Sequence, residues 1–238
     1  MRRYKNEQYN HLVHVQHAFK AEAKADSLDI TIYGDIGESW WSDSTSAVDI
    51  EKTLKATSAN VITINLNSPG GDVFDGIAIY NQLKNHPAKI IINVDGLAAS
   101  AASIIAMAAD ELIMNTGSML MIHEASTWTW GTKLDIRKTL NALEGIDKSL
   151  ADIYMTRYQG ERSEIETMIA NETWFTANEA VEIGLAHKVN ERVEGNDDVM
   201  DPEEFKNSVL QKFRNQKKQN EPVVAITNSN LMNQFKRA

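Results

Sequence analysis

The sequence predicts an α/β fold with a largely parallel sheet, and two observations carry this prediction. Short continuous runs of apolar, mostly β-branched residues recur, among them VITINL (61–66) and KIIINV (89–94), and such runs are typical of strands buried on both faces. Stretches with helical spacing of apolar residues lie between them. This alternation, with a period of roughly 30 residues, is typical of βαβ units with right-handed crossovers.

The chain is predicted to begin its folded part with a strand and a helix. Alternating apolar residues in LDITIY (28–33) predict the strand, which ends at Gly34. Ser44 or Ser46 is placed to cap the helix that follows. The apolar positions of this helix are Val48, Ile50 and Leu54.

Four further elements are predicted in the middle of the chain. VFDGIAIYNQLKNH (73–86) has helical spacing and is stopped by Pro87. AASAASIIAMAAD (98–110) predicts an alanine-rich helix that is apolar on most sides and therefore central. ELIMN (111–115) and MLMIHE (119–124) predict two short strands.

The next part of the chain is predicted to be mainly helical. A long amphipathic helix spans 133–158 and ends near Gly160. SEIETMIANETWFTANEAVEIGL (163–185) predicts two short helical segments, and AHKVN (186–190) follows them.

Three parts are therefore expected along the chain. They are a polar N-terminal segment (1–26), a folded domain (27–190) and a polar tail (191–238) that is partly helical or disordered. Within the tail, Pro202 stands where a helix would start.

Composition argues against several classes of protein. The 238 residues carry a net charge of −9, which argues against general affinity for nucleic acid. There is no cysteine, which excludes disulfides and thiol catalysis and fits a reducing cytosol. No apolar run is long enough to span a membrane, no secretory signal is recognisable, and no ATP-binding P-loop motif occurs. We therefore expect a cytoplasmic protein without metal or cofactor.

Three histidines near the N-terminus are expected on a solvated helix face rather than at a metal site: His11, His14 and His17.

Two loops have the backbone chemistry of an anion site. In NSPGGD (67–72), Pro-Gly-Gly follows a strand, so N–H groups are expected at the carboxyl edge of the sheet, where open α/β folds bind ligands. Taken alone, Pro-Gly-Gly is also a common turn sequence.

The second loop carries Ser100. This serine is expected at the start of a buried helix, where free N–H groups and the helix dipole stabilise an oxyanion. A lone serine at such a position is more often a capping or packing residue.

A serine nucleophile needs a general base. His123 closes an apolar strand and is the main candidate, with a structural core histidine as the alternative. His86 and His187 are weaker candidates. Ser103 is a fallback nucleophile, but it lies almost one helical turn beyond Ser100, where its hydroxyl should be buried. Spacing alone does not select an acid among the chain's 33 carboxylates.

The chain resembles the proteolytic subunit of the Clp protease over roughly residues 30–189. The motifs that carry the resemblance stand in the family's order and spacing: NSPGG (67–71), GLAAS (96–100), MIH (121–123) and EAVEIGLAHKV (179–189). The resemblance implies a ClpP/crotonase-like spiral of ββα units with a protruding handle helix. It also implies a serine endopeptidase that acts on protein or peptide substrates.

The resemblance implies a role for individual residues. Ser100 matches the nucleophile and His123 the general base, while Gly71 and Ala101 match the residues whose N–H groups form the oxyanion hole. Gly70 and Val73 are assigned to substrate binding.

The third member of the triad departs from the family. Glu172 stands where the family usually has an aspartate. Its extra methylene shifts the carboxylate by about 1.5 Å on an unchanged backbone, and a misplacement of about 1 Å is enough to lower the rate. A surface acid beside Trp174 is the alternative.

Other departures resemble the branch that phages and prophages encode. They are IYGDIG (32–37), ETWFTANEA (172–180) and the polar tail. This branch implies a head-maturation (prohead) protease that cuts scaffold or capsid protein. The tail then binds scaffold or resembles it, with a disordered appendage as the alternative.

The helix over 133–158, preceded by TWTWG (127–131), matches the family's handle, which joins rings face to face. A ring-forming homo-oligomer is therefore expected. Several alternatives stay open. They are a housekeeping-type subunit that works with an unfoldase, a catalytically degenerate assembly ring, a crotonase-like thioester enzyme and a Ser–Lys peptidase.

Overall fold

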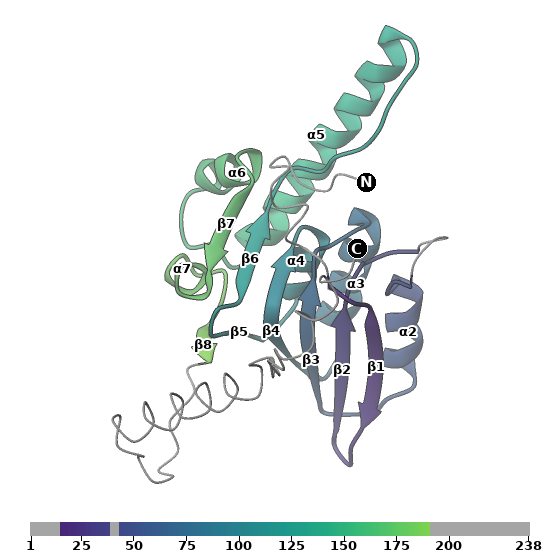
Figure 1. Ribbon diagram of the computed structural model, residues 1–238, viewed down its shortest axis with the longest axis vertical. Coiled ribbons are helices and arrows are strands. Elements are labelled where there is room, and N and C mark those ends of the chain that lie inside the picture. Colours follow the sequence, from purple (N-terminus) through teal and green to yellow (C-terminus); the bar gives the residue numbers. More distant parts are fainter. Residues whose placement is uncertain (1–14, 39–42, 191–238) are drawn as a thin grey trace, which may run out of the picture. The chain divides into compact units, whose positions relative to one another are not determined.

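The computed structural model describes residues 15–38 and 43–190. The predictions for His11, His14, Pro202 and the tail lie outside the described residues. Within them, a mixed sheet is flanked by helices (Figure 1). The strands are β1 (Ala18–Ala23), β2 (Ser27–Tyr33), β3 (Val61–Ser68), β4 (Lys89–Ala99), β5 (Glu111–Asn115), β6 (Met119–Ile122), β7 (Thr173–Thr176) and β8 (Lys188–Asn190). The helices are α2 (Ala47–Lys55), α3 (Val73–Lys84), α4 (Ala101–Ala106), α5 (Lys133–Met155), α6 (Arg162–Ala170) and α7 (Ala177–Glu182).

The sheet is mostly parallel, which confirms the predicted fold class. Strands β2, β3, β4, β5 and β8 lie side by side in parallel, and β1 adds an antiparallel edge to β2. Strand β4 changes partner along its length. Its residues 91–94 pair with β5, and its residues 97–99 pair with β6. Strand β7 then pairs antiparallel with β6. The short strands β6 and β7 thus extend the sheet beyond the end of β5.

The core is built mainly from the alternating isoleucines of neighbouring strands. Ile30, Ile62 and Ile90 are buried, and each belongs to a strand in which burial alternates along the chain. Helix α4 is buried along its whole length, as its alanine-rich, apolar sequence predicted. The side chains of β3 alternate between buried and half-buried positions. The expectation that this strand is buried on both faces therefore holds for one face, while the other is half-buried.

Several predicted boundaries change in the structure. The predicted strand over 28–33 and the capping role of Ser46 at α2 are confirmed. The long helix ends at Met155, before the predicted 158, because the chain turns there to place Arg157 against the core. Strand β4, predicted over 89–94, extends to Ala99.

Sequence analysis missed two strands. They are β7, whose four residues lie between two helices, and β1, which lies in a segment that was assigned no strand. His17 directly precedes β1 and is not helical, so the expectation that it lies on a helix face was wrong.

Helix α5 projects away from the sheet and carries the predicted handle (Figure 1). Its capping box is formed by Thr132 and Asp135. Only its last turns are buried, through Leu150, Ala151 and Tyr154. No helix among residues 15–38 and 43–190 combines the length and the apolar content that crossing a bilayer requires.

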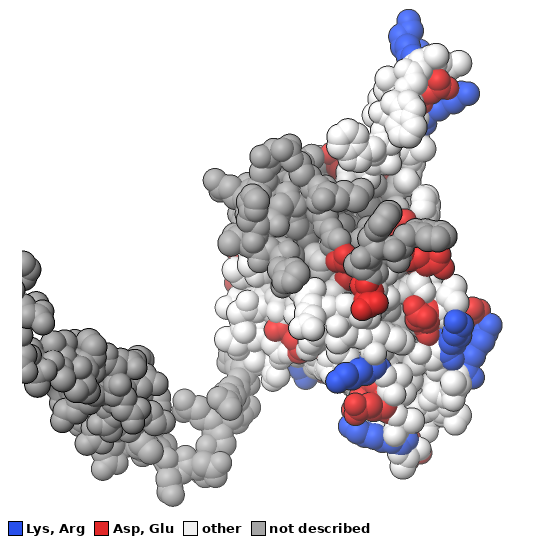
Figure 2. Space-filling model, turned by 45° about the vertical axis from the view of Figure 1, so that its right-hand side comes forward, with Lys and Arg blue, Asp and Glu red and all other residues white. Residues whose placement is uncertain are grey.

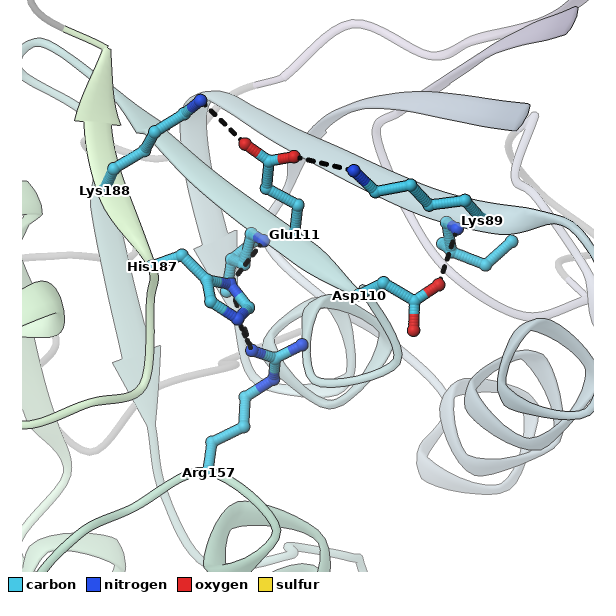
Figure 3. Close-up of polar contacts among 8 residues, drawn as sticks. Lys89, Asp110, Glu111, Arg157, His187 and Lys188 are labelled. Carbon is cyan, nitrogen blue, oxygen red and sulfur yellow. Dashed lines mark hydrogen bonds and ion pairs between the residues drawn. The ribbon is translucent and has the colours of Figure 1, made fainter.

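Two side chains join the end of α5 to the core (Figure 3). Arg157 Nε donates to the Met107 carbonyl over 3.1 Å, and its Nη2 donates to the Ala109 carbonyl. The guanidinium thus satisfies carbonyls at the C-terminal end of α4. Beside it, His187 Nδ1 accepts the Leu112 N–H over 2.7 Å and lies 3.2 Å from Arg157 Nη1. Burial and the Arg157 charge lower the pKa of His187.

This junction predicts a pH-dependent loss of stability. The folded protein favours neutral His187, whereas the unfolded chain protonates it near its ordinary pKa of about 6.5. The contribution of neutral His187 to stability is therefore fully present above about pH 6.5. It is lost progressively as the pH falls from there through the lower pKa of the folded state. His187→Asn keeps an acceptor for Leu112 but does not titrate. We expect its melting temperature to fall less between pH 7.5 and 5.5 than that of the unmodified chain. Equal falls in both proteins would contradict the prediction.

Candidate active site

Ser100 lies at a sharp turn between the end of β4 and the start of α4. Its backbone has φ 57° and ψ −127°, a conformation that L-residues rarely adopt. Its side chain makes no cap hydrogen bond to the helix, so the capping role considered above does not apply. The half-buried Oγ instead lies 2.8 Å from His123 Nε2.

The turn requires a glycine beside it. Gly70 has φ +91°, and a Cβ there would lie within 2.6–2.8 Å of the Ala99 oxygen, Ser100 Cβ and the Ala101 nitrogen. The NSPGG loop therefore packs directly against the Ser100 turn. Its own conformation is held by Ser68, whose Oγ accepts the Gly70 N–H over 3.0 Å.

His123 reaches Ser100 through the pairing of β4 with β6. Leu97–Ala99 lie in parallel register with Met119–Met121, and the Ser100 N–H donates to the Met121 carbonyl over 3.0 Å. His123 follows β6 at the same edge of the sheet. Serine and histidine, 23 residues apart in sequence, are thus brought together by adjacent strand ends.

The two residues assigned to the oxyanion hole, Gly71 and Ala101, lie in the segments beside Ser100. Gly71 forms a parallel bridge with Ile36, in which the Ile36 N–H donates to Gly70 and the Asp72 N–H donates to Ile36. These two bonds use the Gly70 carbonyl and the Asp72 N–H, so the Gly71 N–H takes no part in the bridge. Ala101 opens α4, so its N–H has no partner within the helix. Gly71 and Ala101 both line the same cavity as Ser100.

Glu172 immediately precedes β7, the strand that sequence analysis missed. Strand β7 pairs antiparallel with β6, with Ile122 opposite Thr173. One further step in this register sets position 172 opposite position 123. Glu172 has φ 52°, and among the described residues only Ser100 and Glu172 are non-glycine residues with positive φ. Trp174 Nε1 donates to Glu172 Oε1 over 3.4 Å.

A cavity of about 670 Å³ opens in front of Ser100 and His123. Gly71, Val73 and Phe74 form part of its lining, and α5 supplies another part. The α5 residues that line it are Thr139, Ala142, Leu143, Ile146, Leu150 and Tyr154. Sequence analysis did not place these α5 residues, or Phe74, at the site. Their apolar spacing was the available signal, but it fits an oligomer contact equally well.

The remaining sequence candidates lie elsewhere. Gly70 supports the turn and is not among the cavity-lining residues. His86 Nδ1 accepts the Ala88 N–H, and His187 belongs to the junction with Arg157. Ser103 is fully buried, as predicted, and its hydroxyl contacts Tyr154. No group of three or more potential metal ligands occurs in the part of the chain that the structure describes.

Comparison with known proteins identifies a family with the same sequence motifs and a solved structure with the same fold. The profile of the Clp protease family matches residues 25–193. The chain is 30% identical over 130 residues to ATP-dependent Clp protease proteolytic subunit 3 of Rhodococcus jostii, covering 54% of this chain and 64% of that protein. It is 34% identical over 128 residues to proteolytic subunit 1 of Protochlamydia amoebophila, covering 52% and 62%. The match thus spans a little under two thirds of each of these two relatives.

A solved structure has the same fold. A mutant of ClpP1 from Listeria monocytogenes superposes with a TM-score of 0.56 at 23% identity, covering 70% of this chain and 92% of that one. The profile match extends over most of the folded part and includes the Ser100 turn, His123 and Glu172. The chain belongs to the Clp protease family.

Proposed function

We propose that the chain is a serine endopeptidase with Ser100 as nucleophile and His123 as general base. The observation that carries this proposal is the 2.8 Å contact between Ser100 Oγ and His123 Nε2 at a strained turn facing a large cavity. A hydroxyl is a weak nucleophile on its own, and a hydrogen-bonded imidazole activates it. The named activity of the curated relatives is consistent with this chemistry.

The reaction proceeds through an acyl-enzyme. Ser100 Oγ attacks the peptide carbonyl carbon as His123 Nε2 takes its proton, and the N–H groups of Gly71 and Ala101 bind the resulting oxyanion. The C–N bond then breaks, and His123 gives the proton to the leaving amine. Water attacks the ester with His123 again as base, and the proton returns to Ser100 as the acid product leaves.

Glu172 is proposed as the acid that fixes the His123 tautomer. The antiparallel register of β6 and β7 supports this role, as does the positive φ of Glu172, which turns the chain immediately before β7. Acceptance of the Nδ1–H by a carboxylate leaves Nε2 free to take the serine proton. A glutamate serves here if the backbone turn offsets its longer side chain.

The cavity residues favour this proposal over its rivals. No lysine is among the described residues that line it, so a Ser–Lys mechanism has no base there. A crotonase-like thioester enzyme needs no serine–histidine pair, whereas this site places one at hydrogen-bond distance. Gly71 and Val73 line the cavity next to the nucleophile and are proposed to hold the substrate backbone. Gly70 contributes by shaping the loop.

The proposed substrate class is phage scaffold or capsid protein, cut during head maturation inside the bacterial cytoplasm. This rests on the sequence departures over 32–37 and 172–180. The names of the relatives favour the alternative of a housekeeping-type subunit that receives chains from an ATP-dependent unfoldase. Cleavage of folded prohead components without ATP separates the first role from the second.

A homo-oligomeric ring, stacked through α5, is proposed as the working assembly. The projecting part of the chain exposes large apolar side chains, and Trp128 and Trp130 are 83% and 86% exposed. In α5, Leu134, Ile136 and Leu140 are also exposed, and Ile136 and Leu140 lie on the same side of the helix. Figure 2 shows Lys and Arg side chains at the outer end of the projection and a largely uncharged stretch below them. A helix of this length is stabilised when its apolar stripe meets a partner.

Replacement of the nucleophile provides the direct test of the proposed activity. In Ser100→Ala we expect peptide cleavage to fall by about 10⁴-fold or more, because the acyl-enzyme is not formed. A fluorophosphonate probe should add once to the unmodified chain, at Ser100, as read by intact mass and peptide mapping. Ser126→Ala is the control, since this exposed serine lines the same cavity. Equal cleavage by Ser100→Ala would overturn the assignment.

The role of Glu172 is tested by charge and by length. Glu172→Gln should lower kcat by about 10²- to 10⁴-fold, because the amide no longer fixes the imidazole tautomer. Glu172→Asp should retain more activity than Glu172→Gln. Glu182→Gln, at an exposed site on α7, is the matched control. Unchanged kcat in Glu172→Gln would exclude this residue from the triad.

The assembly is tested by charge on the apolar stripe of α5. Ile136→Glu combined with Leu140→Glu should shift the protein towards smaller species in light scattering at micromolar concentration, because buried charges oppose helix contacts. Lys138→Glu, at an exposed position on the opposite side of the same helix, controls for a change of charge alone. A size distribution that stays unchanged in the double variant would contradict stacking through this surface.

A further inference from the structure

A buried chain of hydroxyl groups leads from α5 to the backbone of the nucleophile. Tyr154 OH lies 2.7 Å from Ser103 Oγ, and Ser103 Oγ lies 2.6 Å from the Ser100 carbonyl oxygen. Tyr154 is 1% exposed and Ser103 is fully buried. The proposed triad uses neither side chain, yet both are polar groups placed next to the reactive serine.

The direction of these hydrogen bonds follows from counting protons. A carbonyl oxygen only accepts, so the single hydroxyl proton of Ser103 points to Ser100. The Ser103 oxygen is then the acceptor for Tyr154, which donates. Burial raises the pKa of Tyr154 and keeps its phenol protonated, as a donor must be. The chain therefore runs in one direction, from Tyr154 through Ser103 to the Ser100 carbonyl.

The Ser100 carbonyl belongs to the same peptide unit as the Ala101 N–H. Because the peptide group is planar, the orientation of its C=O fixes the orientation of its N–H. The Ser100 carbonyl also accepts the N–H groups of Ser103, over 2.9 Å, and Ile104, over 3.3 Å. This peptide follows the strained φ of Ser100, so its plane needs support from the surroundings.

Hydrogen bonds in series polarise one another. A donor at the carbonyl increases the positive partial charge on the N–H of the same peptide, and the effect is largest where water is excluded. An N–H that serves an oxyanion gains from both orientation and polarisation, because its contribution comes from dipoles fixed before the reaction.

We propose that Ser103 and Tyr154 are positioning residues that orient and polarise the Ala101 N–H for the oxyanion. The inference rests on the proposed peptidase function and adds to it two residues outside the triad and the oxyanion hole. It also connects α5 to the reacting centre, because Tyr154 is in the buried end of this helix.

A purely local role for Ser103 is the competing explanation. Serine side chains in helices often bond a carbonyl three or four residues earlier, without any effect on function. Such a role affects folding stability and leaves the balance between substrate binding and transition-state binding unchanged. The two explanations therefore differ in their effects on kcat and KM.

The variants are chosen to delete one hydroxyl at a time. In Ser103→Ala we expect kcat to fall about tenfold with KM within about twofold, which is less than the 10²- to 10³-fold cost of removing an oxyanion donor outright. Tyr154→Phe should lower kcat about threefold, because Ser103 still donates to Ser100. The double variant should match Ser103→Ala, since the two groups act in series. Ser103→Cys, a weaker donor of similar size, should fall between Ser103→Ala and the unmodified chain.

Matched controls remove hydroxyls that do not reach the Ser100 peptide. Ser118 is buried, with no hydrogen-bond partner for its Oγ among the described residues, so Ser118→Ala deletes an equivalent group elsewhere. Tyr158→Phe removes a phenol bonded to Glu164. Both should keep kcat and KM. Melting temperature and light scattering of every variant report stability and assembly separately from catalysis.

A peptide boronate supplies the decisive readout, because its tetrahedral adduct on serine places an oxygen in the oxyanion hole. Its inhibition constant should rise in Ser103→Ala by the same factor as kcat/KM falls, while a product peptide binds unchanged. Unchanged kcat in Ser103→Ala and Tyr154→Phe, or a loss confined to KM, would overturn the inference and leave the peptidase standing. Unmodified protein that neither cleaves peptide nor accepts the fluorophosphonate would overturn both.

Discussion

The candidate site depends on one constraint: along the edge away from β3, strand β4 pairs with two different strands. Its first half lies beside β5 and its second half beside β6, so β4 extends past the end of β5 and delivers Ser100 next to the end of β6. His123 follows β6, and Glu172 precedes β7, which pairs with β6. Hydrogen bonds between adjacent strands thus set the relative positions of three residues that are far apart in the sequence. A shift of register in β6 would move His123 away from the serine and reverse the faces of its neighbours.

The strained turn at Ser100 persists because the packing around it leaves no alternative. Gly70 admits the turn only because it has no side chain, and α4, which follows, is buried throughout. Buried apolar contacts of this helix oppose relaxation of the turn, since relaxation would displace close-packed side chains. The strain places the serine hydroxyl in the cavity, and the following N–H is available to a ligand because it opens the helix. The strained turn is thus maintained by the packing of the helix and the loop that surround it.

Helix α5 serves two parts of the molecule. Its buried end closes the cavity and carries Tyr154, and Arg157 just beyond it satisfies carbonyls at the end of α4. Its outer part exposes apolar side chains that a folded monomer leaves in water. A contact between copies through the outer part would act on the same helix that borders the active site. The proposed assembly surface and the lining of the candidate site thus belong to the same helix.

The sequence by itself determined the class of fold and most of the elements, and it predicted the serine and histidine of the candidate site. The spacing of apolar residues identified five elements, because it follows from which side of an element is buried: β2, β3, β4, α3 and α4. It did not identify β1 or β7, whose short strands depend on a neighbour rather than on their own pattern. Sequence spacing offered many carboxylates, and the resemblance to a family singled out Glu172. Only the tertiary structure decided that Ser100 and His123 touch, that α5 walls the cavity, and that Ser103 and Tyr154 lead to the Ser100 carbonyl. These relations depend on strand register and side-chain direction between distant segments, which the order of residues along the chain does not specify.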